Sequence, residues 1–209
     1  ITPAVISRAR GRSSKLIIRL SVKTINGYKA IARKGKTAQE VFISTDLSKD
    51  ELKQIIDIYN KKDNTIIFCI GGGTYHKPSI LNSNGMVIHE SSACAKYLVN
   101  NNINESHIIR DWSSYDTIAN GYFSFTNYII PLKLKNITII TSEFHYNRVK
   151  LIYNYLNKLF KSNIGIQYLT SENNIEENVL NERIKREKNS CILFKKNIVD
   201  KIHTIEEFV

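Results

Sequence analysis

The sequence predicts an α/β fold with a mostly parallel sheet, helices on both faces of that sheet, and a basic arm at the N-terminus. Strand-like and helix-like patterns alternate from about residue 47 onward, as they do in parallel sheets whose strands are joined by helices. Two apolar runs rich in β-branched residues, 64–70 and 136–140, are typical of strands buried on both faces. Because residues 1–39 contain no Asp or Glu, we divide the chain into an arm, 1–39, and one α/β domain, 40–209.

The first predicted helix covers 47–62. Ser48 at the N-cap and Glu51 three residues later form the pattern of a capping box, and apolar residues then recur at helical spacing. The buried strand 64–70 follows and ends in Gly71, Gly72 and Gly73.

The later elements are predicted on the same grounds. Short apolar runs bounded by polar residues indicate strands, and apolar residues at helical spacing indicate helices. The predicted strands are 106–112, 136–140 and 165–170, and the predicted helices are 89–101, the later part of 113–130, 146–160 and 174–188.

Charge is distributed very unevenly. The formal net charge is +11, but from Glu40 onward 20 Lys and Arg face 19 Asp and Glu, so nearly all of the excess lies in the arm. A basic, acid-free segment of this kind suits the phosphates of RNA. The ten cations of the arm are Arg8, Arg10, Arg12, Lys15, Arg19, Lys23, Lys29, Arg33, Lys34 and Lys36. All of them except Lys23 and Lys29 are assigned to RNA binding.

Other interpretations of the arm stay open. Residues 15–23 alternate as a strand does, so part of the arm could be an extra strand with a basic face. The composition also suits a transit peptide, an anionic membrane surface or an acidic protein. The chain begins at Ile1 rather than at Met, and we therefore expect a processed chain or part of a longer one.

Composition limits the remaining classes. No apolar run approaches the roughly 18–20 residues that cross a bilayer, so no membrane span is expected. Cys69, Cys94 and Cys191 are far apart and odd in number, which does not suit a disulfide framework. The histidines outside the 141–148 segment, His76, His89, His107 and His203, lack metal-ligand spacing, and we expect no metal.

Polar clusters follow the predicted strands directly, in 71–77, 111–117, 141–148 and 170–173. In parallel sheets, ligands bind at the carboxyl ends of the strands, near helix N-termini. We therefore expect these clusters to converge on one edge of the sheet.

The cluster at 141–148 holds the main catalytic candidate. Ser142, His145 and Arg148 are spaced three residues apart, so all three can share one helix face. A His and an Arg beside a helix N-terminus suit an anion site, with His145 as general acid or base. Asp116 is either a helix cap or the carboxylate that orients His145.

The other candidates also have two interpretations. Gly71–Gly73 lack the spacing of a phosphate loop and serve either a tight turn or a backbone cradle for an anion. Glu90 and Ser91, at a predicted helix start, are either caps or ligand contacts.

From about Thr65 to Val209 the chain resembles the YdcF-like (SanA-like) family of unknown-function domains, in its eukaryotic branch. The matching stretches are "GGGTYHKPSILNSNGMVIHESSACAKYL", "WSSYDTIANGYFSFTNYIIPLK", "ITIITSEFHYNR" and "NERIKREKNS". The resemblance implies a Rossmann-like fold with a polar pocket that takes a nucleotide-like molecule such as S-adenosylmethionine. The basic arm is not a feature of that family, and the aromatic, His-containing tail of its eukaryotic members does not follow here.

Carried over by motif, the resemblance adds residues to the pocket. The full set is Gly71, Gly72, Gly73, Glu90, Ser91, Ser114, Asp116, Thr117, Asn120, Thr141, Ser142, His145 and Arg148.

Two functions follow as hypotheses. The first is a Rossmann-like body anchored by its arm to RNA and neighbouring proteins in an organellar ribonucleoprotein such as the mitochondrial ribosome. The alternative is a freestanding enzyme that acts on a phosphate-bearing or nucleotide-like small molecule, with His145 as general acid–base. The expected location is the mitochondrial or another organellar matrix, or the cytoplasm in the alternative.

Overall fold

The structure is a computed structural model of the whole chain, and it describes residues 40–44, 49–61, 65–75 and 77–209. Several predictions lie outside these residues: the basic arm with its RNA-binding cations, the strand at 15–23, the Ser48 cap and His76. Within the described part, no helix combines the length and the apolar composition that a bilayer crossing needs.

The described residues form one five-stranded sheet in which every neighbouring pair is parallel. The predicted mixed α/β fold with a parallel sheet is therefore confirmed. The strands are β1 (Glu40–Ser44), β2 (Thr65–Ile70), β3 (Ile108–Asp111), β4 (Asn136–Ser142) and β5 (Gly165–Ser171), in the order β3-β2-β1-β4-β5. The central strand, β1, was not predicted, because it is only five residues long and directly follows the basic arm.

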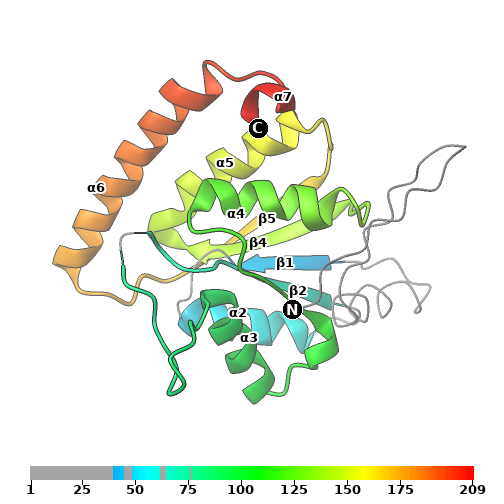
Figure 1. Cartoon of the computed structure of the whole chain (residues 1–209), viewed down its shortest axis with the longest axis vertical. Coiled ribbons are helices and arrows are strands. Elements are labelled where there is room, and N and C mark those ends of the chain that lie inside the picture. The colour runs from blue at the N-terminus through cyan, green and yellow to red at the C-terminus, as the bar shows by residue number, and fades with distance from the viewer. Residues whose placement is uncertain (1–39, 45–48, 62–64, 76) are drawn as a thin grey trace, which may run out of the picture.

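Helices cover both faces of the sheet (Figure 1), as parallel crossovers require. One face carries α2 (Lys49–Tyr59) and α3 (Glu90–Asn100). The opposite face carries α4 (Thr117–Ser124) and α5 (Tyr146–Leu159), with α6 (Glu177–Phe194) outside α5. The short α7 (Ile205–Phe208) follows α6 near the end of the chain.

The sheet divides the core into two apolar layers because side chains alternate along each strand. On β2, Phe68 packs toward α4 and α5, while Ile67 packs toward α2 and α3. On β4, Ile139 and Ile140 divide in the same way, and both are fully buried. The large apolar side chains of β2 and β4 thus each enter one of the two layers, as the continuous apolar runs predicted.

The short segments beside the main elements depart from the predicted bounds. A 3-10 turn, η1 (Glu105–His107), precedes β3, and another, η3 (Glu143–His145), joins β4 to α5. The helix α4 continues into a π-helical turn, η2 (Phe125–Ile129), and α6 continues past the predicted end at 188 into a second one, η4 (Lys195–Val199). The turn η2 lies inside the helix predicted in the later part of 113–130, whereas partly buried apolar residues such as Ile198 accompany the continuation of α6 past residue 188.

The loop after β2 is packed tightly against the loop after β3. Gly71 has φ +129°, a conformation that favours glycine. The N–H of Gly72 donates to the carbonyl of Ser114 at 2.6 Å. A Cβ at Gly72 would lie 2.5 Å from the carbonyl oxygen of Trp112 and 3.0 Å from that of Ser114. The glycine run therefore holds two strand-end loops together.

We expect Gly72→Ala to lower the free energy of unfolding by about 1–3 kcal/mol, because the added methyl group meets backbone atoms that have no room to move. Urea unfolding measures the change. Ser83→Ala, on an exposed residue of the same loop, is the control and should stay within about 0.5 kcal/mol of the wild-type protein. Equal effects of the two substitutions would contradict the packing described here.

Candidate functional site

The site is built around His145, the last residue of η3, directly before α5. Its chain position follows from β4, which brings residue 142 to the carboxyl edge of the sheet. Only 5% of His145 is exposed. A histidine at this depth keeps a fixed ring orientation, which is set by the groups that its two nitrogens contact.

Both ring nitrogens of His145 have partners from other helices. Nδ1 lies 2.7 Å from Oε2 of Glu187 on α6, and Nε2 lies 3.3 Å from Oγ1 of Thr117 at the start of α4. An ionised carboxylate accepts hydrogen bonds and cannot donate them. Nδ1 therefore carries the proton, and in the neutral ring Nε2 is left as the base that faces the Thr117 hydroxyl.

Glu187 also contacts Arg148, whose Nη1 donates to Oε1 at 3.2 Å. Burial raises the pKa of Glu187, but the hydrogen bond and charge of His145 and the charge of Arg148 outweigh it, and the net pKa is below the ordinary 4.5. The carboxylate stays ionised near neutral pH as a result.

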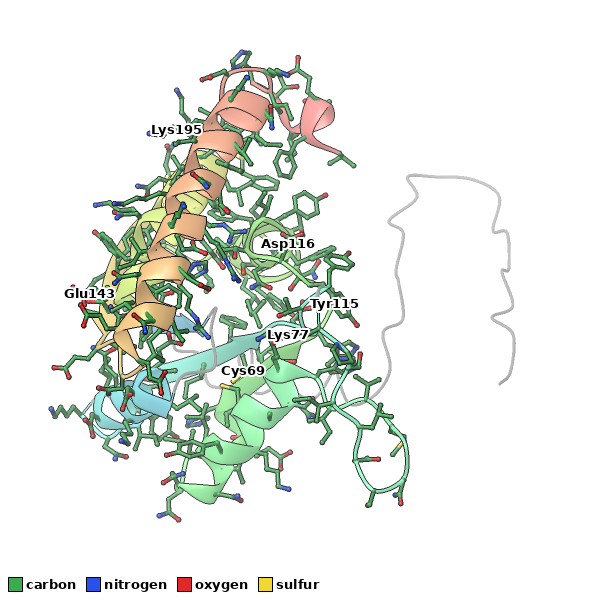
Figure 2. The ribbon with its side chains drawn as sticks, turned by 90° about the vertical axis from the view of Figure 1, so that its left-hand side faces the viewer. Cys69, Lys77, Tyr115, Asp116, Glu143 and Lys195 are labelled. Atoms are coloured by element: carbon green, nitrogen blue, oxygen red, sulfur yellow. The ribbon has the colours of Figure 1, made fainter. Side chains whose placement is uncertain are left out.

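Asp116 occupies the capping position that was one of its two expected roles. It is the N-cap of α4, and its Oδ1 accepts a hydrogen bond from the N–H of Ala119 at 2.8 Å. Figure 2 shows Asp116 and Tyr115 where the chain enters α4, with Glu143 on the side of the molecule where α6 lies. The carboxylate that contacts His145 is Glu187, 42 residues along the chain, and no sequence spacing pointed to it.

Ser142 does not join His145 and Arg148. Its Oγ donates to Oε1 of Glu51, a fully buried residue of α2, at 2.7 Å. Thr141 beside it is also fully buried. A strand sends neighbouring side chains to opposite faces, and this bond directs Ser142 toward α2, on the face of the sheet opposite α4 and α5.

A second polar group surrounds the glycine run at the end of β2. The N–H of Ser91 donates to the carbonyl of Gly71 at 2.9 Å, and the Glu90 carboxylate approaches the place where a Cβ of Gly71 would be. Gly73 also has a positive φ, +156°. Ser114 donates to Oδ1 of Asn120, and this pair ties the β3 loop to α4. Among the residues that the structure describes, the buried Ser91 Oγ has no hydrogen-bond partner.

The residues around His145 and the residues around the glycine run lie on either side of the end of β1, which separates β2 from β4. Neighbouring strands are about 4.8 Å apart, so the groups are about 10 Å from each other across the sheet. Helix α4 connects them, because Thr117 contacts His145 while Asn120, one turn later, contacts Ser114. The predicted residues thus converge on one edge of the sheet, with Ser142 turned away.

A pocket of about 480 Å³ opens beside this edge, between the first turn of α2 and the loop that enters α6. Ser142 is its one residue from the predicted set. Its lining includes two acidic and two basic side chains, and several lining residues lie in the predicted polar clusters 141–148 and 170–173, although only Ser142 was singled out as a site residue. The lining residues are Asp50, Lys53, Ser142, Phe144, Glu172, Asn173, Asn174, Ile175 and Arg183.

We expect Glu187→Gln to lower the free energy of unfolding at pH 7 by about 1–3 kcal/mol, because charge-assisted hydrogen bonds to His145 and Arg148 are lost. The pKa of Glu187 is depressed in the folded state, so its contribution is complete above the unfolded value of 4.5 and is lost as the pH falls through the lower folded value. Urea unfolding of both proteins at pH 7 and at pH 3 measures the change. An equal difference at the two pH values would contradict the assignment.

Comparison with known proteins gives one match. A family described as a predicted metal-binding protein, DUF2103, matches residues 1–61. No curated protein matches the chain, and no solved structure matches it.

The expected resemblance to the YdcF-like family was therefore wrong, because the matching family model is that of DUF2103 and covers residues 1–61. Three of the four stretches that suggested the resemblance carry Gly, Ser, Thr or Asn after strands. Such residues serve turns and helix caps in α/β domains of many families, so they indicate the type of fold more than kinship.

The expectation that no metal is bound is contradicted by the description of the matching family. Residues 1–61 contain no His or Cys, and their five carboxylates are Glu40, Asp46, Asp50, Glu51 and Asp57. Asp50 is engaged by Lys53 and Asn174, and Glu51 by Ser142. In the described part of the chain, no three His, Cys, Asp or Glu are grouped as metal ligands. The described residues thus do not fit a metal centre, and the chain is similar to DUF2103 over residues 1–61.

Proposed function

We propose that the domain is an enzyme that acts on a phosphate-bearing or nucleotide-like small molecule, with His145 as general acid–base. The observation that carries this proposal is the 2.7 Å contact between His145 Nδ1 and the Glu187 carboxylate at the carboxyl end of β4. A base oriented by a carboxylate is the arrangement that acid–base catalysis uses.

The strand order supports the location of the ligand. The order runs outward from β1 through β2 to β3 on one side and through β4 to β5 on the other. This is the order of a Rossmann-like fold, the finer assignment that we propose here. Such sheets bind ligands where the order reverses, which in this chain is at β1 and β4, next to His145.

The chemistry of the surrounding groups supports an anionic substrate. Arg148 has a side chain that is 21% exposed and adds positive charge beside His145. Across the end of β1, the glycine run allows close backbone approach, and the buried Ser91 hydroxyl supplies a polar group for a ligand. A ligand with a phosphate at His145 or at the glycine run, and with a nucleoside or similar moiety at the other of these two places, would span the distance between them.

The charge of the arm favours a second function, the anchoring of the same domain to RNA. Ten cations without a single acidic residue occupy 1–39, and the body needs no such excess for its fold. We propose that the arm holds the domain in an organellar ribonucleoprotein such as the mitochondrial ribosome, in contact with RNA and neighbouring proteins. The two functions are compatible, since an anchored domain keeps its site.

We expect the full chain to hydrolyse at least one of p-nitrophenyl phosphate, bis(p-nitrophenyl) phosphate and a set of nucleoside mono- and diphosphates. His145→Ala should lower kcat by about 10²–10⁴-fold, because the proton-transfer step loses its base. Release of p-nitrophenol or of inorganic phosphate measures the rate. The exposed His203 provides the control, and His203→Ala should keep the wild-type rate. Turnover that survives His145→Ala would end the proposal.

We expect the full chain to bind a single-stranded RNA oligonucleotide with an affinity that falls steeply with salt, because each phosphate contact releases a counterion. Fluorescence anisotropy at several salt concentrations gives the slope. A chain that lacks residues 1–39 should lose the binding and the slope together. Equal affinity of the two chains would show that the arm is not the RNA-binding element.

A further inference from the structure

The contacts of His145 form a continuous line of three groups. The Thr117 hydroxyl lies 3.3 Å from Nε2, and the Glu187 carboxylate lies 2.7 Å from Nδ1. Hydroxyl, imidazole and carboxylate in this order are the parts of an activated nucleophile.

We propose that Thr117 is the nucleophile of the site and attacks the phosphorus atom of a phosphate ester or anhydride. This inference rests on the proposed function and deepens it, because it assigns the bond that is broken and the residue that is modified. His145 is the base, and Glu187 is a positioning residue that fixes the ring and its tautomer. Sequence analysis placed Thr117 among ligand contacts only, with no part in bond making.

The position of Thr117 suits this role. It is the first residue of α4, a helix of eight residues, and the Asp116 cap accepts from the N–H of Ala119. The earliest N–H groups of a helix have no acceptor within the helix, and they lie where the oxygens of an attacked phosphate gather negative charge. Thr117 is 8% exposed, and its branched side chain has few rotamers, so the hydroxyl is held in one direction.

Other buried hydroxyls near the site have partners that direct them elsewhere. Ser142 donates to Glu51, and Ser114 donates to Asn120. Ser124, two turns further along α4, donates to the carbonyl of Asn120 and lies 3.1 Å from the hydroxyl of Tyr153. Of these four hydroxyls, Thr117 is the one in contact with His145.

The reaction balances with water as the second reactant. Thr117 Oγ1 forms a bond to phosphorus while its proton passes to His145 Nε2, and the bond from phosphorus to the leaving oxygen breaks. His145 then gives the proton to that oxygen, and the leaving group departs as an alcohol or a phosphate. In the second half, His145 takes a proton from water, the water oxygen attacks phosphorus, and Thr117 recovers its proton as free phosphate leaves.

A fluorophosphonate probe tests the first half directly, because attack at its phosphorus replaces fluoride and leaves a stable adduct. The full chain is incubated with the probe, and mass spectrometry of proteolytic peptides locates and times the adduct. We expect it on Thr117. Thr117→Ser should keep the labelling, Thr117→Val and His145→Ala should abolish it, and Glu187→Gln should slow it by about tenfold or more.

A matched control removes a hydroxyl of the same kind outside the site. Thr126, on η2, donates to the carbonyl of Tyr122 at 3.0 Å, and Thr126→Val should label at the wild-type rate. Circular dichroism of each variant confirms that it is folded, and Thr117→Ser provides the test if Thr117→Val does not fold.

The outcomes separate the nucleophile from the function on which it rests. No adduct on the wild-type chain, an adduct on another residue, or an adduct that persists in Thr117→Val would overturn the assignment of Thr117. Phosphate release that depends on His145 but is unchanged in Thr117→Val would also overturn it and leave the proposed function standing. An adduct on Thr117 in a chain that hydrolyses none of the phosphate compounds would support the nucleophile and remove the proposed substrate class.

Discussion

The parallel pairing of β1 with β4 is the constraint on which the rest of the structure depends. Ser44 of β1 is in register with Ile140 of β4 and with Cys69 of β2, so all three strands end at the same edge. Parallel strands must be joined by crossovers, and the described segments that follow β2, β3 and β4 all leave the sheet at that edge. Residues that are 26 to 54 positions apart in sequence, such as Ser91, Thr117 and His145, are brought to one edge for this reason.

Glu187 adds a second constraint, on the chemistry of the site. It sits on a helix of which Phe194 alone is buried among the described residues, yet it fixes the histidine ring and neutralises part of the Arg148 charge. Removing two charged partners from water is costly, and their attraction repays the cost only with good geometry. The three groups satisfy this condition because Glu187 uses one carboxylate oxygen for His145 and the other for Arg148.

The sequence was informative wherever apolar burial alone decides the structure. The runs at 64–70 and 136–140 predicted β2 and β4, and the helical spacing after 146 predicted α5. The apolar side chains of these elements can be buried only if the segments form the predicted strands and helix. The strand β1 was missed because five residues carry too little pattern. The extension of α6 past residue 188 was missed because local spacing does not encode what a helix packs against.

The sequence predicted the edge of the sheet at which the candidate site lies, but it did not predict the contacts that the site residues make. The clustering of polar residues after strands located the edge, since the topology fixes where strands end. The partner of His145 was a different matter. Sequence spacing offered only Asp116, whereas the carboxylate that contacts His145 is Glu187, and its position depends on where α6 packs. Ser142 shows the same limit, because its direction depends on the buried carboxylate of Glu51 from a helix 91 residues earlier.

The late position of Glu187 also has a consequence for how the protein is made. A ribosome releases the chain from the N-terminus, and β5, the last strand of the sheet, is complete at Ser171. At that point the strands, His145, Arg148 and Thr117 have all been synthesised, but the carboxylate that orients the ring has not. The contact that orients the His145 ring can therefore form only after α6 has been synthesised and has docked.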